Sequence, residues 1–201
     1  MKIILATNNE HKKEEFIAYF SKYNVEILTL KDVGIAVDPE ENGKTFFDNA
    51  LIKAEAVSLL TNDIVLSDDS GLQINALDGF PGVMSARFLP DKSYQEKFIE
   101  LNKMLESKED RSASFACVLC MVNYQKDPLF FEGKCEGEIL KEPTHIGGFG
   151  YDPIFFYPPY NKSFASLTKD EKNKISHRGK AIEKLIDFLI KEGKIWVSIQ
   201  Q

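Results

Sequence analysis

This sequence of 201 residues has few cysteines, no long apolar run and no excess of positive charge. There are only three cysteines, Cys117, Cys120 and Cys135, and an odd number is typical of a reducing compartment rather than of a disulfide-bonded secreted domain. Cys117 and Cys120 have CxxC spacing, but they lie in the apolar segment 114–122, which we expect to be a buried strand. Residues three apart on a strand face opposite sides, so we predict buried thiols and no chelation by this pair.

No apolar run is long enough to suggest a targeting or membrane-spanning segment. After Met1 and Lys2 the apolar stretch is only Ile3 to Ala6. We therefore expect a cytoplasmic protein with no membrane partner. The formal net charge of −6 argues against a broad nucleic-acid footprint, but small anionic substrates can still bind through local basic residues or a metal ion.

The composition is that of an ordinary globular protein, with 43% hydrophobic and 28% charged residues. At this length we expect a single domain, 1–201, made of two lobes, because no repeat, low-complexity linker or composition shift offers a boundary. The 15 phenylalanines include a late cluster that suggests an aromatic-lined core or surface: Phe149, Phe155, Phe156 and Phe164.

Apolar periodicity predicts strands alternating with amphipathic helices. We expect strands at 2–6, 25–30, 64–67, 72–74, 114–124, 129–139 (one or two) and 154–157. We expect helices at 10–21, from about 45, from Ser93 to about 105 and from Ser176, with capping boxes at Ser93/Glu96 and Thr168/Glu171. The helix from about 45 should bury Phe47, Ala50, Leu51, Ala54 and Ser58, and the last helix Ile182, Leu185, Ile186 and Leu189. Mixed βαβ and hairpin connections predict an α/β fold with a mixed, twisted sheet and flanking helices.

Two adjacent aspartates, Asp68 and Asp69, follow the apolar run 64–66 and precede Ser70 and Gly71. We expect the strand to end here in a tight turn. Successive strand residues point to opposite faces, so only one carboxylate can face a given cleft unless the turn re-aims the other. A carboxylate pair suits a divalent cation or the activation of water, and an ordinary solvated turn is the alternative.

Two further segments have the chemistry of a phosphate and metal site. Residues 7–12, Thr-Asn-Asn-Glu-His-Lys, join a strand to a helix, whose N-terminal N–H groups and Lys12 could cradle phosphate. Glu41 lies in an acidic loop before the helix that carries Lys53. The alternatives are an ordinary asparagine cap with solvated lysines, and a solvated acidic loop.

Two later segments suggest a pocket for a flat ligand. The loop from Gly147 to Asp152 places glycines around Phe149, which could stack on a planar group or pack into a hairpin. His177 and Arg178 begin the last helix, where basic residues oppose the helix dipole at a cost of up to about 1 kcal/mol. Such a cost suggests an anionic or acceptor-rich ligand, and Lys172 adds positive charge nearby in sequence.

In combination and order these segments resemble the noncanonical purine nucleoside triphosphate pyrophosphatase family, the inosine/xanthosine triphosphatases. The resemblance covers nearly the whole chain, and its motifs are Leu5–Asn9 with Lys12, Glu41, Thr45-Phe46 with Asn49-Ala50 and Lys53, Ser67–Leu72, Pro81–Val83 with Ser85–Arg87, Gly147–Pro153 and Ser176–Arg178. Asn8 departs from the glycine often found in the family, but asparagine tolerates left-handed backbone angles.

The resemblance implies an ITPase-like fold with two lobes around a deep cleft. It also implies a cytosolic homodimer that uses Mg²⁺ to hydrolyse ITP, dITP and XTP to the monophosphate and pyrophosphate. The nearest rivals are a Maf-like pyrophosphatase for modified pyrimidine nucleotides and a nucleotide-binding protein without catalysis.

Site roles follow from the resemblance residue by residue. Glu41, Asp68 and Asp69 would bind the metal, and Asp69 would be the base that activates water, although the sequence does not decide which aspartate takes the proton. The remaining substrate contacts would be Thr7, Asn8, Asn9, Glu10, His11, Lys12, Lys53, Ser70, Phe149, Gly150, Tyr151, Asp152, Lys172, His177 and Arg178.

Overall fold

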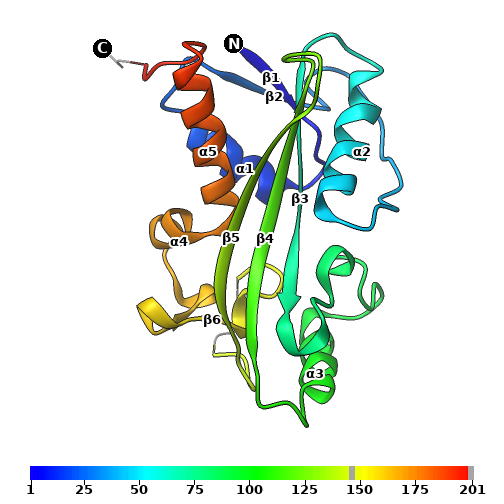
Figure 1. The fold of residues 1–201 in the computed structure, drawn as a ribbon, viewed down its shortest axis with the longest axis vertical. Coiled ribbons are helices and arrows are strands. Elements are labelled where there is room, and N and C mark those ends of the chain that lie inside the picture. The colour runs from blue at the N-terminus through cyan, green and yellow to red at the C-terminus, as the bar shows by residue number, and fades with distance from the viewer. Residues whose placement is uncertain (145–147, 199–201) are drawn as a thin grey trace. The chain divides into compact units, whose positions relative to one another are not determined.

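A computed structural model of the chain describes residues 1–144 and 148–198 (Figure 1). Gly147, the first glycine of the predicted aromatic loop, lies outside the described residues. The helices are α1 (Glu10–Phe20), α2 (Phe46–Ser58), α3 (Tyr94–Met104), α4 (Lys169–Ile175) and α5 (His177–Lys191). The strands are β1 (Lys2–Leu5), β2 (Glu26–Thr29), β3 (Ile64–Ile74), β4 (Ser112–Val122), β5 (Leu129–Ile139), β6 (Phe155–Tyr157) and β7 (Lys162–Ser163).

The seven strands form one sheet in the order β2-β1-β3-β4-β5-β6-β7. β1 is parallel to β2 and to β3, and α1 and α2 make the connections that parallel strands require. β6 is antiparallel to both β5 and β7. The prediction of an α/β fold with a mixed sheet is therefore confirmed.

The chain divides into two compact units. Unit 1 contains Met1–Asp69, Cys117–Glu132 and the segment from Ala181 onward, and unit 2 contains Ser70–Ala116 and Gly133–Lys180. Strands β3, β4 and β5 each begin in one unit and end in the other.

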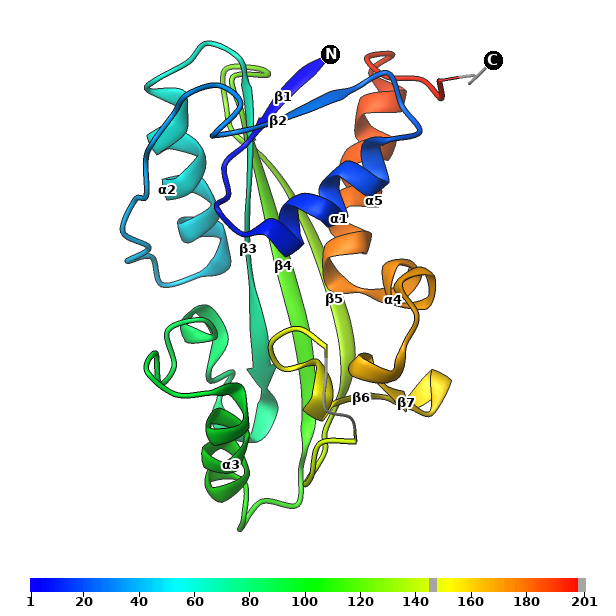
Figure 2. The same ribbon diagram turned by 180° about the vertical axis from the view of Figure 1, so that it is seen from behind.

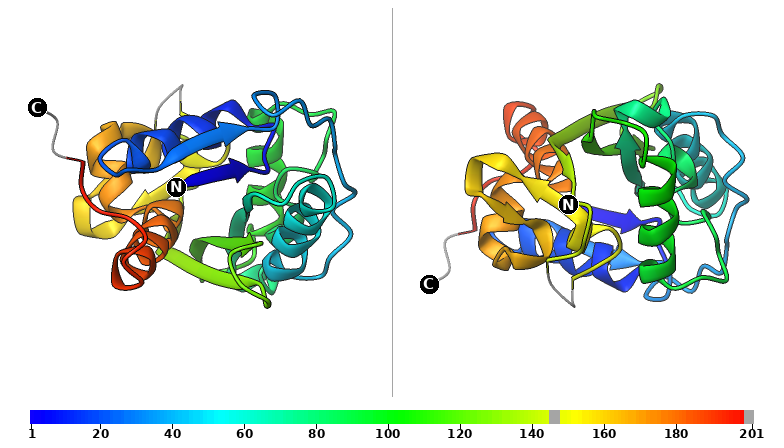
Figure 3. Two further views of the ribbon diagram at one scale, coloured as in Figure 1. Left: turned by 90° about the horizontal axis from the view of Figure 1, so that it is seen from above. Right: turned by 90° about the horizontal axis from the view of Figure 1, so that it is seen from below.

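In unit 1, α1 and α5 share one apolar core with alternate residues of the strands. Figures 1 and 2 show these two helices side by side, with α2 on the other side of β3, and the view from above agrees (Figure 3). The core includes Ile3, Leu5, Phe16, Phe20, Leu66, Cys117, Leu119, Met121, Ala181, Ile182, Leu185, Ile186, Leu189 and Ile195. The predicted inner face of the last helix is confirmed, and all three cysteines are buried.

Unit 2 has its own core, which is rich in aromatic side chains. Phe115 contacts Phe155 and Phe164, with ring centroids 4.5 and 5.6 Å apart. The other buried members are Leu72, Ile74, Phe98, Leu101, Leu105, Ala113, Cys135, Ile139, Tyr151, Ile154 and Ile175. Of the late phenylalanines, Phe155 and Phe164 lie in this core, whereas Phe149 is exposed.

The predicted tight turn after the Asp68-Asp69 pair is wrong. β3 continues without interruption from Ile64 to Ile74, and Gly71 and Leu72 are buried within it. Asp, Ser and Gly favour turns locally, but strand pairing and burial on both sides override that preference here. The aspartates therefore lie in the middle of a long strand.

The predicted buried face of α2 is also shifted. Phe47 is 41% exposed, and the residues that face inward are Phe46, Asn49, Ala50, Ala54 and Val57. Because Phe46 and Phe47 are adjacent, the sequence holds two overlapping apolar stripes, and helical periodicity alone does not choose between them. The observed stripe brings Asn49 inward.

All three expected helix starts with named caps are present. Ser93 and Thr168 form capping boxes with Glu96 and Glu171, and Ser176 Oγ accepts the Gly179 N–H at 3.0 Å. Within the described part of the chain, no helix is long and apolar enough to cross a membrane.

Candidate active site

Asp68 and Asp69 project to opposite faces of β3, as the alternation of a strand requires. Asp68 points to the same face of β3 as Leu66, two residues earlier. This face is covered by α1, and Lys12 Nζ lies 3.0 Å from Asp68 Oδ2. Asp69 points to the same face as Ser67, two residues earlier. This face is covered by α2, and Ser67 Oγ donates to the Ala50 carbonyl at 2.5 Å. Each carboxylate therefore meets the helix on its own side of the sheet.

Asp69 is held by two side chains of α2. Lys53 Nζ lies 3.2 Å from its Oδ1, and Asn49 Nδ2 donates to its Oδ2 at 3.2 Å. Lys53 Nζ also lies 2.9 Å from Oε1 of Glu41, so one ammonium group bridges two carboxylates from different segments. The predicted residues Glu41, Lys53 and Asp69 thus converge within unit 1.

Burial and opposing charges both act on this cluster. Burial of Lys53 opposes its charge, but the carboxylates of Asp68, Asp69 and Glu41 outweigh that effect and raise the lysine pKa. Burial also raises the pKa of Asp69, with Lys53 and Lys12 acting against the shift and Glu41 adding to it. A carboxyl with a raised pKa is better suited to accept a proton than an ordinary surface aspartate.

The predicted phosphate loop leads from β1 into the first turn of α1. Thr7 Oγ1 accepts the Asn9 N–H at 3.2 Å, and Asn9 caps the helix by accepting the Lys12 N–H at 3.2 Å. Lys12 turns toward Asp68, whereas Glu10 is exposed and pairs with Lys13 at 3.3 Å. His11 and Asn8 are also exposed, so the inward-facing member of this loop's charged side chains is Lys12.

The donor set of unit 1 suits a hard divalent cation. Glu41, Asp68 and Asp69 supply carboxylate oxygens, the ligand type that Mg²⁺ prefers. In residues 1–144 and 148–198, however, no three His, Cys, Asp or Glu side chains already converge as a metal cluster. Instead, the ammonium groups of Lys12 and Lys53 lie against these carboxylates.

In unit 2, Asp152 organises the predicted base-binding loop. Its Oδ2 accepts the Phe149 N–H at 3.1 Å and lies 2.6 Å from Lys172 Nζ. Gly148 has φ +87°, and a Cβ there would come within 3.1 Å of Asp152 Cβ, so the bend leaves little room for a side chain. Phe149 is left 41% exposed, as a ring that stacks on a ligand needs to be.

Tyr151 points away from solvent. It is 4% exposed, and its hydroxyl donates to the Ser85 carbonyl at 2.9 Å. Burial, followed by the nearby Tyr94, raises the pKa of Tyr151. The hydroxyl thus ties the aromatic loop to the turn at 82–85.

His177 and Arg178 are both buried at the start of α5. The His177 imidazole stacks on Phe115, with centroids 4.9 Å apart and planes at 17°. Arg178 Nη2 donates to Ser70 Oγ at 3.1 Å. Arg178 is thereby fixed beside Ser70, which follows the aspartates in sequence, and His177 is fixed beside Phe115.

The chain is similar to known proteins of one family over most of its length. A sequence profile described as the Ham1 family matches residues 3–188. The chain belongs to the Ham1 family. It is 46% identical over 194 residues to the dITP/XTP pyrophosphatase of Thermoanaerobacter pseudethanolicus, covering 95% of this chain and 98% of that protein. It is 44% identical to the dITP/XTP pyrophosphatase of Clostridium perfringens, covering 94% and 97%.

Solved Ham1 structures share the fold as well. The Ham1 protein of Staphylococcus aureus gives a TM-score of 0.88 at 38% identity, covering 96% of this chain and 100% of that one. The HAM1 protein of Coxiella burnetii gives 0.89 at 38% identity, covering 95% and 99%. The family resemblance read from the sequence is confirmed.

Two residues of this Ham1 chain were not predicted as site residues, although each forms a hydrogen bond to one that was. Asn49 contacts Asp69, and Ser85 accepts the Tyr151 hydroxyl. Asn49 carries a readable signal, because it lies one helical turn before Lys53 and beside Ala50 and Ala54 on an otherwise apolar stripe. Ser85 contributes a backbone carbonyl, which a side-chain pattern does not reveal.

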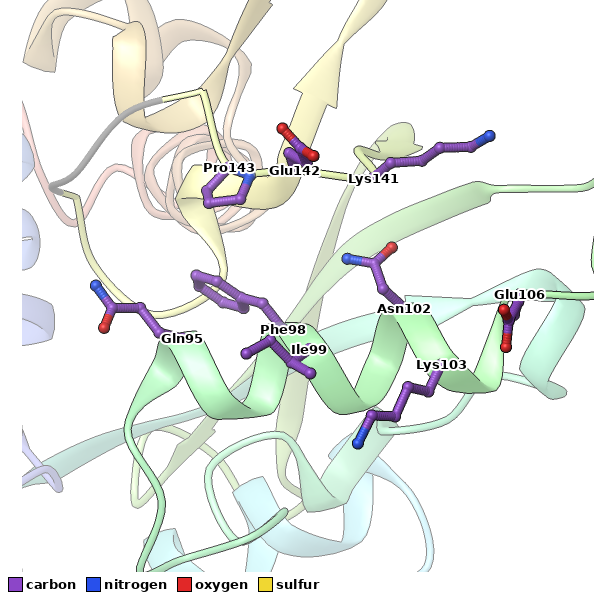
Figure 4. Close-up of a pocket in the computed structure, with 9 residues that line it drawn as sticks. All are labelled: Gln95, Phe98, Ile99, Asn102, Lys103, Glu106, Lys141, Glu142 and Pro143. Atoms are coloured by element: carbon purple, nitrogen blue, oxygen red, sulfur yellow. The ribbon is translucent and has the colours of Figure 1, made fainter.

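Among the described residues, cavities are found in both units. One in unit 1, of about 590 Å³, is lined by Asn8, Leu30, Lys31 and the segment 34–38. Another in unit 2, of about 540 Å³, runs along α3 (Figure 4) and is lined by Gln95, Phe98, Ile99, Asn102, Lys103, Glu106, Lys141, Glu142 and Pro143. The α3 cavity contains no predicted site residue of the Ham1 chain.

Proposed function

We propose that this Ham1-family protein is a Mg²⁺-dependent pyrophosphohydrolase that converts dITP, ITP and XTP to the monophosphate and pyrophosphate. Two relatives that match more than nine-tenths of the chain carry the name dITP/XTP pyrophosphatase. The observation that carries the proposal is the set of ion pairs around the buried Asp68 and Asp69, in which Lys12 contacts Asp68, and Lys53 contacts both Asp69 and Glu41. These pairs bring acids for a metal next to amines for phosphate.

In this proposal unit 1 binds the triphosphate and the metal. Phosphate oxygens would contact Lys12, Lys53 and the N–H groups at the start of α1, from the segment 7–12. The cluster already sets three carboxylates against two ammonium groups, and a triphosphate adds further negative charge. Glu41 and Asp69, which Lys53 joins on one face of β3, would hold Mg²⁺, and the ion would supply charge neutralisation for the polyphosphate and the leaving pyrophosphate. Asp68, the third predicted ligand, would have to turn from Lys12 on the opposite face to join them.

Asp69 is proposed as the general base. Its carboxylate would accept a proton from the water that attacks phosphorus, while the bond to the pyrophosphate group breaks. Lys53 and Asn49 hold both oxygens of Asp69, which fixes the direction in which the carboxylate presents a lone pair. Asp68, by contrast, faces the other side of β3 and pairs with Lys12.

Unit 2 is proposed to bind the purine. Phe149 would stack on the base, Gly150, Asp152 and Lys172 would line its edge, and Ser70 would contact a phosphate. Tyr151 would support this loop from beneath through Ser85. His177 or Arg178 would donate to the 6-oxo group of hypoxanthine or xanthine, and adenine would leave that donor unpaired, which can discriminate by roughly 10⁴-fold.

A panel of nucleotides tests the proposal directly. Pyrophosphate release would be measured from dITP, ITP, XTP, GTP and ATP, each with Mg²⁺ and with excess chelator. We expect Mg²⁺-dependent release from the first three and much slower release from ATP. Absence of turnover with all three, despite a folded protein, would refute the proposal.

The same assay separates the rival functions. Preferential cleavage of modified pyrimidine triphosphates would indicate a Maf-like activity, and binding without turnover would indicate a nucleotide-binding protein. The comparisons favour neither rival. We also propose that the protein is cytoplasmic and forms a homodimer. Sedimentation of the purified protein measures its oligomeric state.

A further inference from the structure

The buried amide of Asn49 joins two segments that carry acidic residues of the cluster. Its Nδ2 donates to Asp69 Oδ2 at 3.2 Å, and its Oδ1 accepts the Gly43 N–H at 2.8 Å. Asn49 is 0% exposed, and its hydrogen bond to Asp69 is buried, whereas its bond to Gly43 is partly buried. One side chain thereby fixes the loop after Glu41 and the carboxylate of Asp69.

The loop side of this link leaves no spare room. A Cβ on Gly43 would lie 2.5 Å from Asp48 Cβ and 2.6 Å from Asn49 Oδ1. Asp48 is itself fixed, because its side chain accepts the N–H groups of Lys44 and Thr45. A side chain at position 43, two residues beyond Glu41, would therefore force the loop to shift away from the start of α2.

Lys53 completes the arrangement one helical turn further along α2. Its ammonium group bridges Glu41 and Asp69, the same two segments that Asn49 joins through hydrogen bonds. Lysine has a long, flexible side chain, whereas the short amide of Asn49 can hold one geometry. Asn49 can thus orient Asp69 in a way that Lys53 alone does not.

We propose that Asn49 is a positioning residue that aims the Asp69 carboxylate and sets the Glu41 loop against it. This inference rests on the proposed pyrophosphohydrolase function, in which Asp69 takes the proton. Asn49 does not touch the reacting atoms in this role. It acts through Asp69 and through Gly43.

The first test is Asn49→Asp, which keeps an acceptor for the Gly43 N–H but removes the donor to Asp69. We expect kcat for dITP to fall roughly 10- to 10²-fold, as for residues that orient metal ligands, with a smaller change in KM. Asn75→Asp is the matched control, since Asn75 Nδ2 also donates a side-chain hydrogen bond, to Ser112 Oγ at 2.7 Å, but lies outside the cluster. Wild-type kcat in Asn49→Asp would overturn the proposal.

A double variant separates positioning from a purely structural role. If Asn49 acts through Asp69, adding Asn49→Asp to Asp69→Asn should cost little further activity. Full additivity of the two losses would overturn the proposal.

If the single variant does not fold, Gly43→Ala tests the contact between Asn49 and the loop. It should raise the Mg²⁺ concentration for half-maximal turnover roughly 10-fold, and an unchanged requirement in that variant would count against the proposal.

Metal-free thermal unfolding supplies a readout that does not depend on activity. Asn49→Asp places two carboxylates in contact and should lower Tm, and Asp69→Asn in the same chain should restore it, because the pair again holds one amide and one acid. Failure of this rescue would overturn the contact on which the inference rests. Absence of dITP hydrolysis by the wild-type protein would instead refute the proposed function and leave the rescue measurable.

Discussion

At the scale of single residues, the acid cluster of unit 1 is stabilised by lysines rather than left as bare carboxylates. Lys12 pairs with Asp68, and Lys53 pairs with Asp69 and Glu41, at 2.9–3.2 Å. Removing one member of a buried pair leaves a desolvated charge, so substitutions here affect stability as well as chemistry. Informative variants must therefore keep shape and change one property.

Asp69→Asn is such a variant, because asparagine keeps the size of the side chain and can still accept from Asn49. We expect turnover of dITP to fall roughly 10²-fold or more, since the general base is lost, while the fold is retained. Steady-state kinetics and thermal unfolding measure the two effects. Asp63→Asn, an exposed acid just before β3, is the control, and near-normal turnover in Asp69→Asn would contradict the role of Asp69.

Arg178→Ala tests the basic start of α5. Removal of Arg178 loses its hydrogen bond to Ser70, which lowers the stability. It also removes a cation from a helix N-terminus, where such a charge is unfavourable by a few tenths to about 1 kcal/mol, so part of the lost stability is regained. We expect KM for ITP to rise by more than the stability changes. Ser70→Ala removes the same hydrogen bond but leaves the guanidinium, so it should raise KM less. A large drop in Tm with unaltered kinetics would show that Arg178 is structural.

At the scale of elements, the sequence predicts the helices well and β3 poorly. Capping residues such as Ser93 and Thr168 act through neighbours three positions away, so local sequence is enough to find them. Pairing of β3 with β1 ends at Leu66, so the extension of β3 through Asp68 and Asp69 depends on its other neighbour, β4, and on the lysines that α1 and α2 supply from distant positions. That information is not local.

The candidate site likewise combines residues that local sequence identifies with residues that only the folded structure reveals. Asp68, Asp69 and Lys53 are recognisable as residue types in a family order, and the structure brings them together. Asn49 was not predicted as a site residue, because its spacing to Lys53 is informative only once the inward face of α2 is known. Its importance comes from which stripe of α2 faces inward, and the adjacent Phe46 and Phe47 make that stripe ambiguous.

Tyr151→Phe tests how the aromatic loop of unit 2 is held. The variant removes the hydroxyl that donates to the Ser85 carbonyl in a buried setting, and losing such a bond costs about 1–3 kcal/mol of unfolding free energy. We expect lower stability with KM for dITP nearly unchanged. Tyr160→Phe, at a tyrosine that is 40% exposed, is the matched control and should change neither. A raised KM without a stability loss would mean that the Tyr151 hydroxyl contacts substrate.

At the scale of the whole molecule, the chain passes between the two units several times. β3, β4 and β5 each contribute residues to both, so neither unit is a continuous stretch of sequence. The apolar residues of one strand consequently belong to two cores: Leu66 to that of unit 1, and Leu72 and Ile74 to that of unit 2. Unfolding either core would release a strand on which the other core depends.

Because of these shared strands, we expect denaturant to unfold the protein in one cooperative transition. The single tryptophan, Trp196, lies in unit 1, so its fluorescence reports on that unit. A second tryptophan introduced by Phe88→Trp in a Trp196→Phe background would report on unit 2. The two probes should give coincident midpoints after correction for the stability of each variant. Midpoints that remain separate would show that the units unfold independently and that the shared strands do not couple them.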